Sequence, residues 1–124
     1  MTAPVTLGMV VLDAPDPRGL AEFYAGLLGW ALDADDTSDD WVTIRGGEGT
    51  TAIAFQRVPD LPRATWPTGP VPQQSHLDLH VPAYAPHEAR ALELGAELVD
   101  ASEDHASFRV YTDPAGHPFC LCLV

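Results

Sequence analysis

Two consecutive runs of the chain repeat one order of predicted elements, and this repeat constrains the fold more than any other feature. In each run a strand is followed by a helix and then by three strands. A strand leucine and the glycine that ends the next helix lie 17 positions apart in the first run (Leu12, Gly29) and 16 apart in the second (Leu79, Gly95). The repeat predicts an α+β fold of two βαβββ modules that form a curved mixed sheet around a cleft, with the helices on its outer face.

The first run contains a well-bounded helix. Asp16 is a favoured N-cap, Pro17 a favoured first helical residue and Gly29 a favoured stop. Between these limits the apolar residues recur at helical spacing, namely Leu20, Phe23, Tyr24, Leu27 and Leu28. Strands are expected at 6–14, 30–34, 41–45 and 50–58, and the acidic segment 35–40 is expected to be a solvated turn.

The second run follows a proline-rich segment. Its expected elements are a strand at 76–81, a helix at 85–95 and strands at 96–100, 107–113 and 117–124. Five prolines within residues 59–74 exclude regular structure there and stiffen the segment. We therefore expect a single domain over residues 1–124, with one module at about 4–58, a connector at 59–74 and a second module at about 75–124.

Charge and composition argue against several partners. The formal net charge is −12, with only six Lys and Arg residues, so nucleic acid and anionic membranes are poor partners. No apolar run approaches the length of a membrane span, and the first residues lack the basic segment of a signal peptide. We expect a cytoplasmic protein. Cys120 and Cys122 agree with this, because a disulfide between residues two apart on a strand is strained.

The stretch "SHLDLHV" contains the main candidate functional residues. His76, Asp78 and His80 alternate with apolar residues, so they project from one face of a strand. A half-buried strand with a wet face explains this alternation without any function. The functional alternative is that His76 lines a cleft and binds a ligand or metal or moves a proton, with Asp78 also touching the ligand.

Three motifs together identify a family resemblance. They are "DPRGLAEFYAGLLGW", "HLDLHV" before a helix, and "DPAGHPFCL" at the end. In this order they resemble the vicinal oxygen chelate superfamily, which includes glyoxalase I, bleomycin-resistance proteins and extradiol dioxygenases. The chain is most similar to the small glyoxalase-like domain proteins. The resemblance covers essentially the whole chain and implies a homodimer.

The resemblance also implies positions for a divalent metal. His76 stands at one ligand position and Gln56 is the candidate for another. Met9 occupies a third position and is no ligand for a hard or borderline divalent ion, and Cys120 occupies the fourth, where the family usually has a glutamate. The standard site is therefore incomplete. No cofactor is expected, and the alternative is a divalent metal at a non-standard site with His76 and Gln56, or with a Cys120 thiolate that selects a softer ion.

Other residues keep two interpretations each. Trp66, in the polar connector, is a candidate lid, ligand contact or dimer contact. The other aromatic residues either line a ligand cavity or belong to the core, namely Trp30, Trp41, Phe55 and Phe119. Arg45 and Arg57 are anion anchors or solvated strand ends, and Cys120 is a ligand contact or a buried apolar residue. His87, His105 and His117 have no spaced partner in the sequence.

Three functions remain open. The first is a protein that binds a small, partly apolar or aromatic molecule in the cleft without the standard metal. The second is an isomerase, lyase or dioxygenase of glyoxalase-like type, with His76 as metal ligand or general acid/base. The third is a protein-interaction module that uses the Trp66 segment.

Overall fold

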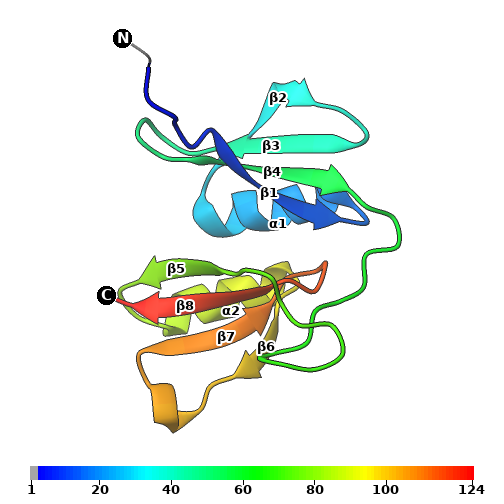
Figure 1. Ribbon diagram of the computed structural model, residues 1–124. Helices are drawn as coiled ribbons and strands as arrows, with labels where there is room; N and C mark the ends of the chain where they lie inside the picture. Colours follow the sequence, from blue (N-terminus) through cyan, green and yellow to red (C-terminus); the bar gives the residue numbers. More distant parts are fainter. Residues whose placement is uncertain (1–2) are drawn as a thin grey trace. The chain divides into compact units, whose positions relative to one another are not determined.

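The computed structural model describes residues 3–124, and they form two compact units, one up to Pro59 and one from Asp60 onward (Figure 1). Each unit contains one four-stranded sheet and one long helix. The proline-rich segment belongs to the second unit. None of the helices in these residues is long and apolar enough to cross a membrane.

The first unit has the predicted βαβββ order. Its elements are β1 (Met9–Ala14), α1 (Pro17–Leu28), β2 (Ala31–Thr37), β3 (Trp41–Arg45) and β4 (Ala52–Arg57). The strand order in the sheet is β1-β4-β3-β2. β1 and β4 are parallel, and the other neighbours are antiparallel. Helix α1 is the crossover that carries the chain from β1 to the far edge of the sheet.

The second unit repeats this topology. Its elements are β5 (Leu77–Val81), α2 (Ala85–Leu94), β6 (Glu97–Asp100), the short 3₁₀ helix η1 (Glu103–His105), β7 (Phe108–Thr112) and β8 (Pro118–Leu123). The sheet order is β5-β8-β7-β6, with β5 parallel to β8. The predicted α+β class and the two βαβββ modules are confirmed, and the strands form one sheet of four in each module.

The helix ends follow from the residues predicted there. The Asp16 side chain accepts a hydrogen bond from the Gly19 backbone N–H at 3.1 Å, and Pro17 begins α1. Gly29 ends the helix at a φ of +72°, a backbone region that glycine adopts without steric cost. Gly95 ends α2 in the same left-handed region, whereas Tyr84 at its start has no side-chain cap.

One local prediction was wrong, and one element was not predicted. The acidic segment 35–40 is not wholly a turn, because β2 continues to Thr37 and pairs there with Val42. The Thr37 hydroxyl donates to the Asp33 carbonyl at 2.7 Å, which supports the irregular end of this strand. The 3₁₀ turn η1 was not expected, and it gives His105 partners that the sequence did not reveal.

The proline-rich segment has no regular structure, as predicted, but it is tied to the second module. Arg63 donates to the Pro114 carbonyl at 2.9 Å, and Thr65 forms a bridge with Pro72. Gly116 has a φ of +93°, and an added Cβ there would lie 2.8 Å from the Arg63 side chain. Glycine at this turn lets the segment lie close to it.

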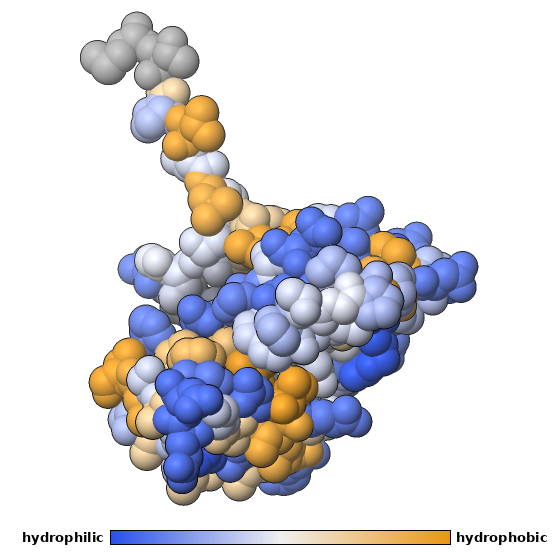
Figure 2. All heavy atoms as spheres, turned by 60° about the horizontal axis from the view of Figure 1, so that its bottom comes forward, coloured by the Kyte–Doolittle hydropathy of each residue, from blue (hydrophilic) through white to orange (hydrophobic). Residues whose placement is uncertain are grey.

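The surface agrees with the strongly acidic composition. Figure 2 shows hydrophilic side chains over much of the viewed face, with hydrophobic patches between them. Part of the core lies between each helix and its sheet. In the first module, for example, the Tyr24 and Phe55 rings stack with centroids 5.8 Å apart.

The cap of α1 gives a stability prediction. We expect Asp16→Ala to lower the free energy of unfolding by about 1 kcal/mol, because the Gly19 N–H loses its acceptor. Chemical denaturation measures this loss. Asp39→Ala is the matched control, since it removes the same charge from an exposed position. An equal loss in both variants would contradict the capping role.

Candidate ligand site

The strand β5 separates its side chains onto two faces. Asp78 lies opposite Cys120 on β8, and Leu77 lies opposite Phe119. Phe119 stacks on Tyr111, whose hydroxyl donates to Glu88 of α2 at 2.8 Å, so this is the helix-covered face. Asp78 and Cys120 therefore lie on the face without the helix, as the alternation predicted for the polar side chains.

His76, Asp78 and Cys120 form a compact cluster on this face. One potential ligand atom from each lies within 4.8 Å of the others. The His76 Nε2 atom is 3.1 Å from Asp78 Oδ1. The His76 Nδ1 atom is 3.1 Å from the Gln73 Oε1 atom, so both ring nitrogens have polar partners. This cluster is the candidate ligand site.

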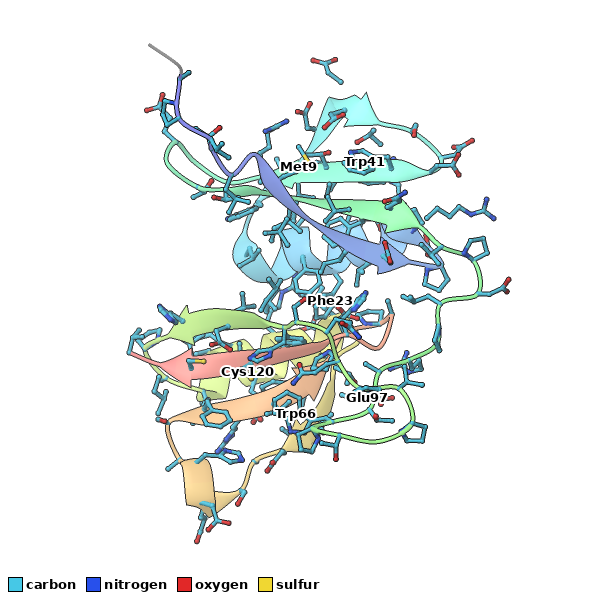
Figure 3. All side chains as sticks on the ribbon, in the orientation of Figure 1. Met9, Phe23, Trp41, Trp66, Glu97 and Cys120 are labelled. Carbon is cyan, nitrogen blue, oxygen red and sulfur yellow. The ribbon has the colours of Figure 1, made fainter. Side chains whose placement is uncertain are left out.

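Trp66 brings an aromatic ring to the cluster from the proline-rich segment. Its ring centroid lies 5.6 Å from that of His76, with the two rings nearly perpendicular at 88°. Edge-to-face contact of this kind is a favourable aromatic arrangement. Figure 3 labels Trp66 in this segment and Cys120 on β8. Four residues predicted as ligand contacts therefore lie together in the second module, namely His76, Asp78, Cys120 and, beside His76, Trp66.

The two cysteines are free thiols with different environments. Cys120 is buried, with 3% of its surface exposed, and Cys122 is half-buried. Burial, together with the nearby Asp78 charge, raises the pKa of Cys120 to about 12. Burial and Asp78 also raise the pKa of Cys122. Both shifts favour the neutral thiol, with burial as the larger cause and the Asp78 carboxylate as the second.

The other predicted site residues lie elsewhere. Gln56 is exposed on β4 of the first module, opposite Asp13 and Trp41. Met9 lies in the same sheet opposite Ala52. His80 follows Asp78 on the helix-free face of β5, opposite Cys122.

Several alternatives for the aromatic and basic residues are resolved by their contacts. Phe55 and Phe119 are fully buried core residues. Arg45 pairs with Asp33 at 2.7 Å, and Arg57 lies 3.7 Å from Asp40, so acidic neighbours engage both guanidinium groups.

Gln73 is the contact that the sequence analysis missed. It lies at the end of the proline-rich segment, three residues before His76, and its amide oxygen is the partner of His76 Nδ1. The sequence offers only a weak signal for this contact, namely a few polar residues between the proline-rich segment and the strand. The contact is seen only in the structure, where the segment folds back onto the second module.

Comparison with known proteins places the fold in a family. The Glyoxalase-like domain family matches residues 9–122. No curated protein matches the chain. A glyoxalase/bleomycin resistance protein/dioxygenase family enzyme from Burkholderia phytofirmans PsJN has a similar structure, with a TM-score of 0.77 at 17% identity, covering 97% of this chain and 99% of that chain.

Two further solved structures share the fold. The fosfomycin resistance protein FosX from Mesorhizobium loti has a TM-score of 0.68 at 12% identity, covering 100% of this chain and 94% of that one. The bleomycin-binding protein of Streptomyces verticillus, solved with copper(II)-bleomycin, has a TM-score of 0.60 at 16% identity, covering 99% of each chain. The predicted resemblance is confirmed, and this chain belongs to the family of glyoxalase-like domain proteins.

Proposed function

We propose that the second module binds a small, partly apolar or aromatic molecule at the cluster of His76, Asp78 and Cys120, beside Trp66 and without a metal ion. One observation carries the proposal. The ring nitrogens of His76 contact Asp78 and Gln73, while the Trp66 ring packs edge-to-face against the same imidazole. Polar anchors beside an aromatic surface are typical of small-molecule sites.

Protons are sufficient to hold the cluster together. The Asp78 carboxylate lies 3.1 Å from His76 Nε2, and its charge favours the neutral thiol of Cys120 and of Cys122. His76 either donates from both ring nitrogens or accepts from a Gln73 amide turned by half a rotation. In both arrangements the groups are satisfied without a metal ion.

A metal ion would have to replace this network. An imidazole, a carboxylate and a thiolate suit a zinc-type ion better than magnesium or calcium. Such an ion would supply a Lewis acid, with His76, Asp78 and Cys120 as the protein ligands. These residues fit such an ion only in part. Cys120 must lose its proton to bind the ion, and burial and the Asp78 charge both raise the pKa of that thiol.

The two rings define the type of ligand. Trp66 is half-buried, so part of its ring surface is accessible. Because the Trp66 and His76 rings are perpendicular, a flat ligand can stack on one ring while its edge meets the other. Asp78 would accept a hydrogen bond from a donor group on the ligand. The proposed ligand is therefore a small aromatic molecule with at least one polar donor.

The relatives support small-molecule binding on this fold. The Streptomyces verticillus structure contains copper(II)-bleomycin, and that protein is a bleomycin-binding protein. The Mesorhizobium loti protein is a fosfomycin resistance protein. At these low identities the likeness supports the use of the fold and not a particular ligand for this chain.

The contact between His76 and Asp78 favours a second candidate, an enzyme acting on a small oxygenated metabolite. A carboxylate 3.1 Å from Nε2 would orient the imidazole, and Nδ1 would exchange a proton with a substrate that takes the place of the Gln73 amide. If this enzyme used a metal ion, Gln56 would be the second predicted metal ligand beside His76. His76→Gln should abolish turnover if this function holds, whereas a binding protein would have no turnover to lose. We also propose that the protein is a homodimer. We further propose that it is cytoplasmic, which agrees with its two free cysteines.

Ligand binding tests the first proposal. In chelator-treated protein, a small aromatic ligand found by fluorescence or thermal-shift screening should bind about tenfold more weakly to Trp66→Ala and to His76→Ala. Isothermal titration calorimetry measures the change. Trp30→Phe is the control for loss of a tryptophan, because Trp30 lies in the first module beside Gly46. Unchanged affinity in both site variants would refute this site.

The thiol titration tests the hydrogen-bonded cluster. In a Cys122→Ser background, ultraviolet thiolate absorbance should give Cys120 a pKa near 12. Asp78→Asn should lower it by about one unit or more, because the carboxylate that opposes the thiolate charge is gone. Asp104→Asn serves as the charge control. The stabilisation due to the neutral thiol is complete below its ordinary pKa and is lost as the pH rises toward 12. An equal pKa in the Asp78 and Asp104 variants would contradict the contact.

A further inference from the structure

His105 occupies a position that the proposed ligand site does not use. It ends η1, the 3₁₀ turn that connects β6 to β7. Its side chain is only 21% exposed, and its ring stacks on Phe108 with centroids 4.1 Å apart and 12° between the planes. The sequence predicted no partner for this histidine, but the fold gives it two.

Both partners of His105 can only accept hydrogen bonds in their usual state. The Nδ1 atom lies 3.0 Å from the Phe108 carbonyl oxygen, and Nε2 lies 3.0 Å from Asp100 Oδ2. A neutral imidazole carries one N–H and can satisfy one of them. The doubly protonated ring satisfies both. This differs from His76, where the Gln73 amide can turn to donate.

The charges around the ring favour the same state. Asp100 faces it from β6, and Glu103 and Asp104 flank it within its own turn. From β7, Arg109 lines the same small hollow, but its guanidinium is bound to the Glu88 carboxylate of α2 at 3.1 Å. Tyr84, before α2, is the remaining titratable group on this hollow. Three carboxylates thus lie near the ring in space or in sequence, and the one nearby guanidinium, that of Arg109, is already paired, so the charges favour a protonated ring.

The segment around His105 is also tied to α2 and to β8. The Tyr84 hydroxyl donates to the Ala106 carbonyl at 2.8 Å, and the Arg109 guanidinium lies 4.1 Å above the Tyr84 ring. Leu123 of β8 donates to the Ser107 carbonyl at 2.8 Å. The hollow, of about 110 Å³, lies between these groups. The residue after His105 is therefore in direct contact with Tyr84, which precedes α2.

We infer that His105 is a pH-sensitive clasp that holds the β6–β7 connection closed against β7 while both ring nitrogens carry protons, and that loosens segment 101–107 when one proton is lost. Loss of the proton leaves either Asp100 or the Phe108 carbonyl without its donor. A neutral ring cannot repair this by changing tautomer, because each tautomer satisfies only one partner. Segment 101–107 is then still held by the hydrogen bond from the Tyr84 hydroxyl to the Ala106 carbonyl.

The direction of the pH dependence follows from the two titrating groups. The hydrogen bond to Asp100 is the main cause that raises the pKa of His105, so its stabilisation is complete below the ordinary imidazole pKa and is lost as the pH rises through the raised value. The backbone N–H of Ser102 and then His105 lower the pKa of Asp100, so its contribution is lost only as the pH falls through that lowered value. The clasp is therefore closed between these limits and opens on the alkaline side.

Nitrogen-15 NMR of the histidine rings tests the clasp in the full chain. At mildly acidic pH both His105 nitrogens should show protonated shifts, and the backbone amides of 101–107 should change with the same midpoint as the ring. Asp100→Asn should lower the midpoint, because the carboxylate is replaced by a neutral amide. His105→Gln should remove the pH-dependent change from these amides.

A substitution on α2 gives the control. His87→Gln removes another histidine of the same module and should leave the ring and amide midpoints of the clasp unchanged. If His105→Gln fails to fold, the comparison of wild type with Asp100→Asn still decides the question. The inference is overturned if the His105 midpoint is the same in both proteins, or if the amides of 101–107 do not follow the ring. This outcome is independent of ligand binding at His76.

Discussion

The parallel pairing of β5 with β8 is the constraint on which the candidate site depends. It places Asp78 beside Cys120 and Leu77 beside Phe119, so one face of the sheet packs under α2 and the other keeps the polar groups. A shift of one residue in this register would turn the leucines outward and bury the carboxylate. The apolar packing of the helix-covered face therefore fixes the geometry of the polar face.

The repeat shows how the candidate cluster comes to lie in the second module. With Leu12 and Leu79 as equivalent positions, the strand pair of Val11 and Ala54 in the first module corresponds to that of Asp78 and Cys120 in the second. The topology is the same, but the first module has small apolar side chains where the second has a carboxylate and a thiol. Met9 likewise corresponds to His76. Selection of side chains on a shared backbone, rather than a change of fold, gives the second module its polar cluster.

Much of the fold was predictable because its signals are local. Asp16, Pro17 and Gly29 bound α1 through backbone requirements, and the alternation around Asp78 determines which side chains share a face. The contacts of Gln73 and Trp66 with His76 were not predictable, because they depend on how a proline-rich segment folds back onto the module. The pair of His105 and Asp100 depends similarly on a 3₁₀ turn with no periodic signal. Non-local contacts made by irregular backbone are where sequence patterns carry least information.

The central claim is that protons rather than a metal ion hold the cluster of His76, Asp78 and Cys120 together. Elemental analysis of purified, untagged protein tests it most directly, after incubation with zinc and other divalent metals and removal of excess ion. The account predicts no stoichiometric metal in wild type, and no difference between wild type and His76→Ala. Stoichiometric metal that is retained by wild type and lost in both His76→Ala and Cys120→Ser would contradict it, because the thiol would then have to bind as a thiolate.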